Sequence, residues 1–172
     1  MLFVCTGNIC RSPLGERLLE AKLPQQAFEV ASAGVMAMVG QGMDPDAAAQ
    51  LQRRGGDPTG FRAHQISERL LRAADLILVA TLAHRQRILE ELPSALNKTF
   101  TILEFADLVQ SAQGETPGAL VAYAARHRST STLDELDVPD PYRGGEAAHA
   151  EAAQLISDAV DRIAEALMAV SG

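Results

Sequence analysis

The N-terminal segment, residues 1–24, constrains the fold most, because a short apolar strand passes through a polar loop into an amphipathic helix. Residues 2–4 predict a buried strand. Residues 6–13 predict a loop, since Gly and Asn adopt left-handed conformations at low cost. Ser12 is expected to cap the following helix, with Pro13 at its first position. The buried stripe of this helix is expected to comprise Leu14, Leu18, Leu19 and Leu23.

Strands and helices alternate along the rest of the chain. Further strands are expected at residues 28–31, 76–79 and 100–103. Helices are expected at 44–54, 67–71 and 82–92, within 114–128 and at 146–170, with a mobile connection at 129–136. This alternation predicts an α/β fold of three layers, in which helices cover both faces of a central four-stranded parallel sheet. We expect one domain spanning residues 1–172.

Charge and composition exclude several classes of partner. The formal net charge is −7 and no long cluster of Lys or Arg is present, so a nucleic-acid partner is not expected. No apolar run approaches the roughly 20 residues that span a bilayer, so we expect no membrane insertion and a cytoplasmic location. Two cysteines, Cys5 and Cys10, lie in one short loop, which indicates chemistry rather than a disulfide framework. A monomer is expected.

The loop that follows the first strand carries the candidate chemistry. Ligands of open parallel sheets bind beyond the carboxyl ends of the strands, and a helix N-terminus offers free N–H groups to a phosphate. Cys5 at the start of this loop is expected to be a thiolate nucleophile, and Arg11 to hold two phosphate oxygens with its planar fork. Ser12 can donate a hydrogen bond to the Cys5 sulfur. The expected phosphate-binding residues are Thr6, Gly7, Asn8, Ile9, Cys10, Arg11 and Ser12.

Two separate segments resemble one family of enzymes. Residues 4–13 read Val-Cys-Thr-Gly-Asn-Ile-Cys-Arg-Ser-Pro, which is similar to the signature of the low-molecular-weight protein tyrosine phosphatases. The late segment Asp140-Pro141-Tyr142 also matches a segment of that family. The resemblance implies that Cys5 forms a phosphocysteine intermediate on the phosphate-binding loop between the first strand and the first helix. It implies further that Asp140 protonates the leaving phenolate and then activates water.

The same resemblance assigns supporting roles to other residues. Asn8, Ser12 and Ser32 are expected to hold the loop in shape, although Phe61 stands where the family carries a histidine of this network. Ile9, Met38 and Tyr142 are expected to line the substrate pocket. Cys10 is expected to form a reversible disulfide with Cys5 under oxidation.

The expected partner is a phosphotyrosine protein. The aliphatic loop at residues 35–40 resembles the bacterial branch linked to capsule and exopolysaccharide export, whose members act on autophosphorylated bacterial tyrosine kinases. No cofactor is expected, and no metal site either, since the histidines show no ligand-like spacing in the sequence. These histidines are His64, His84, His127 and His149.

Three alternatives stay open. A protein phosphoarginine phosphatase uses the same fold and loop but resembles this chain less, because it has Thr where Ile9 stands. An arsenate reductase needs further cysteines to pass on oxidising equivalents. A non-catalytic phosphate-binding regulatory module could keep the loop without a general acid, which Asp140 argues against.

Overall fold

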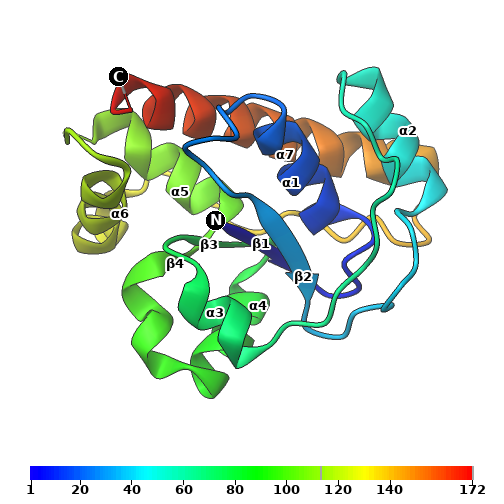
Figure 1. Cartoon of the computed structure of the whole chain (residues 1–172), viewed down its shortest axis with the longest axis horizontal. Coiled ribbons are helices and arrows are strands. Elements are labelled where there is room, and N and C mark those ends of the chain that lie inside the picture. The colour runs from blue at the N-terminus through cyan, green and yellow to red at the C-terminus, as the bar shows by residue number, and fades with distance from the viewer. Residues whose placement is uncertain (113, 172) are drawn as a thin grey trace.

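A four-stranded parallel sheet forms the centre of the computed structural model, which describes residues 1–112 and 114–171 (Figure 1). The strands are β1 (Leu2–Cys5), β2 (Ala31–Gly34), β3 (Ile77–Val79) and β4 (Thr99–Thr101). Their order in the sheet is β2-β1-β3-β4, so β1 lies inside the sheet and pairs with both β2 and β3. The expected fold class, with all four strands parallel, is confirmed.

Helices cover both faces of this sheet, as Figure 1 shows with α1 and α7 on one side and α3 and α4 on the other. Phe3 of β1 packs in a core shared with α1 (Arg11–Glu20), α2 (Pro45–Arg53), α5 (Ile102–Leu108) and α7 (Gly145–Ala169). Leu2 and Val4 point to the other face and pack with α3 (Glu68–Ala73) and α4 (Leu82–Glu91). This alternation follows from the two-residue repeat of a strand buried on both faces. Outside these layers lie α6 (Pro117–Arg126) and three short 3₁₀ segments, η1 (Pro93–Lys98), η2 (Val109–Ser111) and η3 (Arg128–Thr130).

The expected boundaries are wrong at three elements. β2 begins at Ala31 rather than at residue 28, because residues 24–28 form a turn and Phe28 packs on the core from outside the strand. β4 ends at Thr101, whose hydroxyl caps α5 in a reciprocal capping box with Glu104, so residues 102–103 are helical. Helix α1 begins at Arg11, and Ser12 lies inside it as a buried residue rather than as its cap.

Other expectations for local structure have mixed outcomes. The ends of four helices, α2, α3, α4 and α7, lie within two residues of the expected ranges. Helix α6 fills only part of residues 114–128. The expected mobile connection at 129–136 starts within η3, and directly after η3 the Asp107 carboxylate accepts hydrogen bonds from Ser131 and Thr132. The single domain stays a prediction. Among the described residues, no helix combines the length and the apolar character needed to cross a membrane.

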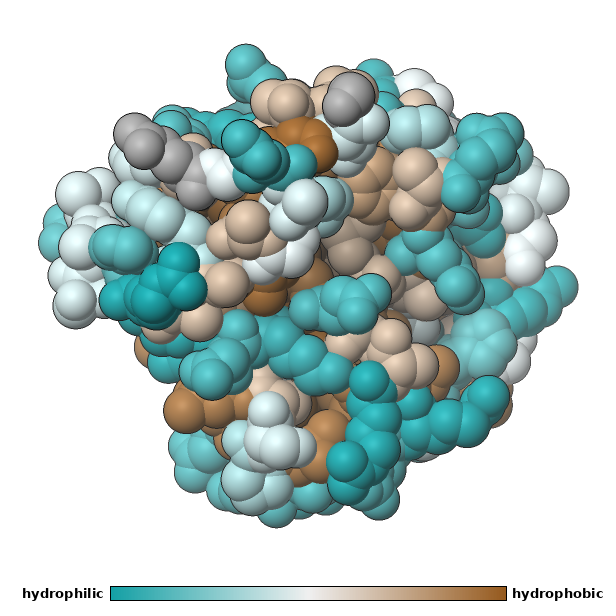
Figure 2. Space-filling view, turned by 60° about the vertical axis from the view of Figure 1, so that its left-hand side comes forward, coloured by the Kyte–Doolittle hydropathy of each residue, from teal (hydrophilic) through white to brown (hydrophobic). Residues whose placement is uncertain are grey.

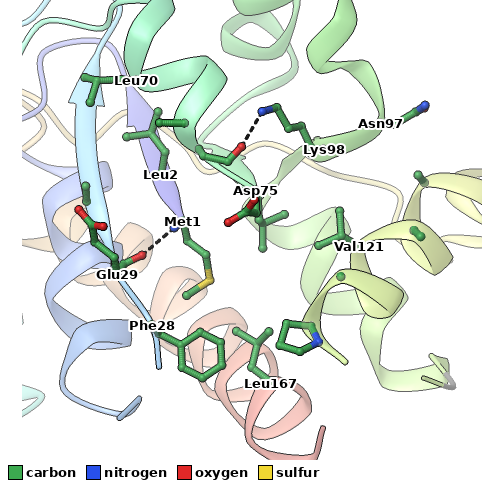
Figure 3. A pocket seen from close by; sticks show the side chains of 18 of the residues that line it. Met1, Leu2, Phe28, Glu29, Leu70, Asp75, Asn97, Lys98, Val121 and Leu167 are labelled. Atoms are coloured by element: carbon green, nitrogen blue, oxygen red, sulfur yellow. Dashed lines mark hydrogen bonds between the residues drawn. The ribbon is translucent and has the colours of Figure 1, made fainter. Parts of the chain in front are cut away.

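The amino edge of the sheet carries a large groove. Its cavity volume is about 910 Å³, and Met1, Phe28, Val121 and Leu167 are among its lining residues (Figure 3). Figure 2 brings this side of the molecule forward and shows hydrophobic residues recessed between hydrophilic ones. The Met1 ammonium group donates to the Glu29 carbonyl oxygen at 2.6 Å.

Candidate active site

The loop between β1 and α1 is held by main-chain hydrogen bonds to the segment that follows β2. The carbonyl oxygens of Cys5, Thr6, Gly7 and Ile9 each accept a bond of 2.9 Å, from the N–H groups of Val35, Met36, Met38 and Asp44 in turn. These bonds turn the carbonyl groups of the loop toward residues 35–44, a segment we call the wall loop. No hydrogen bond joins the N–H groups of residues 7–10 to another group in the described part of the chain. The loop therefore presents free N–H donors at the N-terminus of α1, where an anion binds well.

Gly34 at the end of β2 permits this close approach of the two loops. A Cβ atom at position 34 would lie 2.5 Å from the Thr6 carbonyl oxygen and 3.0 Å from the Asn8 nitrogen. Both contacts involve main-chain atoms of the phosphate-binding loop, and the Thr6 oxygen is already held by the Met36 N–H. Any side chain larger than hydrogen would therefore push the phosphate-binding loop away from the wall loop.

Asn8 is the centre of the support network, and its side chain is fully hydrogen bonded. Its Nδ2 donates to Ser12 Oγ at 2.9 Å and to Ser32 Oγ at 2.8 Å, while its Oδ1 accepts from the His64 main-chain N–H at 2.8 Å. The residue is completely buried and has a φ of +54°, a left-handed conformation that Asn tolerates better than most residues. The tight turn of the loop is thus fixed by three hydrogen bonds to one amide group.

The absence of the family histidine at Phe61 does not leave this network open. Phe61 packs beside Ile9 and Cys10 as part of a small apolar cluster, and the His64 main chain supplies the donor that Asn8 needs. Ser32 in turn donates to a Glu16 oxygen, and burial raises the pKa of this Glu16 carboxyl group. Glu16 is a support residue that sequence reasoning missed, because no local pattern links residues 16 and 32.

Cys5 lies at the floor of the loop, where only 2% of its surface is exposed. Its Sγ is 3.0 Å from Ser12 Oγ. Since Ser12 Oγ accepts a hydrogen bond from Asn8, its own proton can be donated to the sulfur or to the Ala33 carbonyl oxygen, which lies farther away at 3.4 Å. The geometry therefore places one hydroxyl donor and the free N–H groups of the loop around a single thiol.

Arg11 is buried and already orders the segment that carries the candidate acid. Its Nη1 donates to the Val138 carbonyl oxygen at 3.0 Å, and its Nη2 lies 2.9 Å from Asp140 Oδ2. Val138 is tied to the sheet by a hydrogen bond to the Ala80 carbonyl oxygen at 2.8 Å. The Arg11 side chain is 4% exposed and the Asp140 side chain 53% exposed, so the pair joins the interior of the site to its rim.

One atom of Arg11 has no partner. Its Nε is buried and makes no hydrogen bond in the described part of the chain. An unpaired buried donor costs roughly 1–3 kcal/mol, and more on a charged group. A bound oxyanion would supply the missing acceptor, so the guanidinium group is oriented for a ligand as well as for Asp140.

These groups surround a cavity of about 180 Å³. Its lining residues are Cys5, Thr6, Gly7, Ile9, Cys10, Arg11, Met36, Met38, Asp140 and Tyr142. The structure thus brings together the expected catalytic side chains of Cys5, Arg11 and Asp140 and the expected pocket residues Ile9, Met38 and Tyr142. Asn8, Ser12 and Ser32 lie behind the loop. Met36, which is 74% exposed, is an additional wall residue.

His84 is a second support residue that the sequence did not indicate. Its Nε2 lies 2.9 Å from Thr6 Oγ1, and its Nδ1 lies 2.8 Å from Thr81 Oγ1. Burial and the nearby positive charge of Arg11 lower the pKa of His84 to about 4, so its ring is neutral at physiological pH. Thr6 and His84 are 78 residues apart, which is why spacing along the chain could not reveal the contact.

Cys10 lies on the other side of the loop from His84 and has no disulfide partner. Burial, followed by the negative charge of Asp44, raises the pKa of the Cys10 thiol. Its pairing with Cys5 under oxidation stays a prediction.

Comparison with known proteins identifies the family. Residues 1–124 match the family described as "Low molecular weight phosphotyrosine protein phosphatase". The low-molecular-weight protein-tyrosine-phosphatase Wzb of Escherichia coli strain K12 is 32% identical over 169 residues, covering 98% of this chain and 95% of that protein. A protein-arginine-phosphatase of Geobacillus stearothermophilus is 33% identical over 168 residues, covering 97% of this chain and 95% of that protein.

A solved structure agrees with this result. The crystal structure of the tyrosine phosphatase Wzb from E. coli K30, in complex with sulphate, has a TM-score of 0.74 and 32% identity, covering 95% of this chain and 94% of that one. The fold and the loop define a phosphatase of the α/β class. The chain belongs to the low-molecular-weight phosphotyrosine protein phosphatase family, and its relatives include enzymes named for two different phosphorylated residues.

Proposed function

We propose that this enzyme hydrolyses phosphotyrosine in proteins through a phosphocysteine intermediate. The observation that carries the proposal is a narrow cavity with a thiol at its floor, apolar walls and a carboxylate at its rim. Cys5 is the floor, Ile9 and Met38 are walls, and Asp140 lies at the rim. A phosphate on a long, flat apolar ring fits such a cavity, whereas a phosphate on a short serine side chain does not reach the floor.

In the first step, the Cys5 thiolate attacks phosphorus on the side opposite the phenolate oxygen. The S–P bond forms as the P–O bond to the ring breaks, and the Asp140 carboxyl group gives its proton to the departing oxygen. The unpaired Nε of Arg11 supports a direct role for its fork on the phosphoryl oxygens, and the loop N–H groups stabilise the charge that develops there. Binding of the phosphate displaces Asp140 from Arg11 and leaves the carboxyl group facing the leaving oxygen.

In the second step, water attacks the phosphocysteine and Asp140 takes up its proton. The P–O bond to water forms as the S–P bond breaks, and the electron pair returns to the Cys5 sulfur. The hydroxyl group of Ser12, 3.0 Å from that sulfur, stabilises the departing thiolate. The products are the free enzyme and inorganic phosphate.

Phosphoarginine is the second candidate substrate, since a relative that is 33% identical carries the name protein-arginine-phosphatase. The wall of the cavity favours the aromatic substrate. The side chains of Ile9, Met36 and Met38 offer no strong hydrogen-bond acceptor to a guanidinium group. The natural partner we propose is an autophosphorylated bacterial tyrosine kinase, which would present its phosphotyrosine on a flexible tail.

Steady-state hydrolysis of a phosphotyrosine peptide in EDTA tests this proposal, with phosphoserine and phosphoarginine substrates alongside. We expect turnover of phosphotyrosine by the wild type and none above background by Cys5→Ser, which keeps the loop but removes the nucleophile. Rapid quenching should trap a phosphorylated Cys5 during turnover. Faster hydrolysis of phosphoarginine than of phosphotyrosine would assign the chain to the arginine phosphatases instead.

A further inference from the structure

Three side chains with metal-binding atoms converge behind the phosphate-binding loop. One ligand atom from each of Cys10, Asp44 and His149 lies within 4.8 Å of the other two. Cys10 also lines the cavity that holds Cys5, Arg11 and Asp140, whereas Asp44 and His149 do not. Residues 10, 44 and 149 are far apart in the sequence, which is why their spacing gives no indication of a shared site.

The fold holds these three residues at the ends of three helices. Cys10 precedes α1, Asp44 precedes α2, and His149 lies in the second turn of α7. Two contacts fix α2 against α7. Arg53 Nη2 donates to Glu146 Oε1 at 2.7 Å, and Arg54 Nη2 donates to Gln154 Oε1 at 3.2 Å. The cluster is therefore built by packing of helices and not by a mobile loop.

His149 is the strongest sign that the cluster takes a ligand. Its side chain is 3% exposed, and neither ring nitrogen makes a hydrogen bond in the described part of the chain. Its Nε2 points at Asp44 and lies 3.5 Å from Oδ1. A buried imidazole beside a carboxylate, with a thiol in the same group of ligand atoms, is well placed to hold a cation between them.

Asp44 has an oxygen left for such a partner. Its Oδ1 caps α2 by accepting hydrogen bonds from the N–H groups of Asp46, at 3.0 Å, and Ala47, at 3.3 Å. Its Oδ2 makes no hydrogen bond within the described residues. The cap fixes the carboxylate group in place, and the second oxygen stays available.

We propose that Cys10, Asp44 and His149 bind one zinc ion. Thiolate, imidazole and carboxylate are the ligands that zinc prefers, and three protein ligands leave a fourth tetrahedral position for water. Ligand atoms about 2.0–2.3 Å from a tetrahedral zinc ion lie about 3.3–3.6 Å apart. Zinc bound by Oδ2 would lie on the carboxylate whose Oδ1 is 3.5 Å from His149 Nε2, and the three ligand atoms lie within 4.8 Å of one another, so small side-chain movements close the remaining distances.

Zinc at this site would act on the loop from behind. The Asp44 N–H donates to the Ile9 carbonyl oxygen at 2.9 Å, so the ion would join the loop, α2 and α7 into one unit. Binding releases the Cys10 thiol proton to solvent and leaves its sulfur bonded to the metal. While zinc is bound, the Cys10 sulfur is not free to form a disulfide with Cys5.

The test is zinc binding by full-length Cys5→Ser, because this variant removes the other thiol that could take the metal. We expect one zinc per chain by equilibrium dialysis. We also expect a thiolate-to-metal charge-transfer band with cobalt as a spectroscopic substitute. The melting temperature should rise by about 5–10 °C at a zinc concentration a hundred times the Kd.

Two histidine variants in the Cys5→Ser background provide the decisive comparison. Cys5→Ser/His149→Gln should lose at least about 100-fold in zinc affinity, since even partners outside the ligand set account for 10–100-fold. Cys5→Ser/His127→Gln, altered on a different helix, should bind as Cys5→Ser does. The single variant His149→Gln should retain phosphatase turnover, which shows that it folds. Unchanged affinity in Cys5→Ser/His149→Gln, or binding by the wild type that Cys5→Ser abolishes, would overturn the proposal.

Discussion

Of the two edges of the four-stranded sheet, the one with the smaller cavity carries the candidate catalytic groups. The amino edge holds a groove of about 910 Å³, whereas the cavity at the carboxyl edge measures about 180 Å³. At the amino edge two ammonium groups are already paired with main-chain carbonyl oxygens. Lys98 Nζ, for example, donates to the Ala74 carbonyl oxygen at 2.6 Å, as the Met1 ammonium does to Glu29 (Figure 3). At the carboxyl edge, Arg11 Nε is buried and has no hydrogen-bond partner among the described residues.

The comparison teaches that the candidate active site is marked by oriented polar groups without hydrogen-bond partners. The volume of a cavity does not mark it. The loop after β1 carries free N–H donors, a thiol and a guanidinium group because the carboxyl ends of parallel strands point their following loops to one place. Its shape is fixed from two sides, by Asn8 and by His84. The amino-edge groove is lined by apolar side chains such as Phe28 and Leu167 together with charged ones such as Asp75 and Arg126.

The largest effect that separates the two edges should come from Asp140→Asn. We expect kcat on a phosphotyrosine peptide to fall roughly 10²–10⁴-fold, because the leaving phenolate loses its proton donor. The loss should shrink on an aryl phosphate whose leaving group needs no proton. Asp134→Asn, an exposed carboxylate in the same acidic stretch, is the matched control and should behave as wild type. An equal loss on both substrates would contradict the assignment of Asp140 as the acid.

The next largest effect is expected at Asn8, on stability as well as on activity. Asn8→Ala removes three hydrogen bonds and leaves Ser32 and the His64 N–H without their partner, at a cost of about 3 kcal/mol in the free energy of unfolding. Asn8→Gly loses the same bonds but accepts the φ of +54° without strain, so it should be about 1 kcal/mol more stable than Asn8→Ala. Urea unfolding measures both variants. Equal stability of the two would show that the left-handed conformation is not under strain.

A smaller effect, confined to acid pH, is expected at His84. Its pKa of about 4 in the folded protein lies below the ordinary histidine pKa of 6.5, so the unfolded chain binds the extra proton first. The contribution of His84 to the free energy of unfolding is complete above pH 6.5. It is lost as the pH falls toward 4, and the loss reaches roughly 2 kcal/mol by pH 5. His84→Gln should remove this part of the acid dependence, measured as the difference between the two proteins in urea unfolding at pH 7 and pH 5. Parallel curves for wild type and variant would exclude His84 as the source.

The smallest effect is expected at the amino edge. Lys98→Met removes the hydrogen bonds to the Ala74 and Arg72 carbonyl oxygens, which we expect to cost about 1 kcal/mol in the free energy of unfolding. kcat/KM for the phosphotyrosine peptide should not change. A drop in kcat/KM at constant stability would break the comparison, because it would show that the groove takes part in the reaction.

The sequence predicted the sheet and the loop more completely than the contacts that support them. The Cys5–Arg11 string and the strands at the centre of the sheet could be recognised because local pattern and burial agree there. β2 was misplaced because its residues Ala-Ser-Ala-Gly have low strand propensity, and pairing with β1 overrides that preference. The start of α5 was missed although Thr101 and Glu104 form a capping box that spacing could have indicated.

Side-chain contacts between distant residues could not be predicted in the same way. The bond between Thr6 and His84, the bond between Ser32 and Glu16, and the approach of His149 to Asp44 all depend on how helices pack on the sheet. No periodicity encodes such contacts. Ser12 shows the same limit, because its position suggested a helix cap while its hydroxyl group is used by Cys5 and Asn8.

The main-chain bonds between the phosphate-binding loop and the wall loop have a consequence for engineering. Because backbone atoms make these bonds, the side chains of Met36 and Val39 are free to change, and both are already exposed. Substitutions at these two positions could change the rim of the cavity while the catalytic residues keep their geometry. Natural drift has the same freedom, so the choice of protein target can diverge among relatives that share one catalytic apparatus.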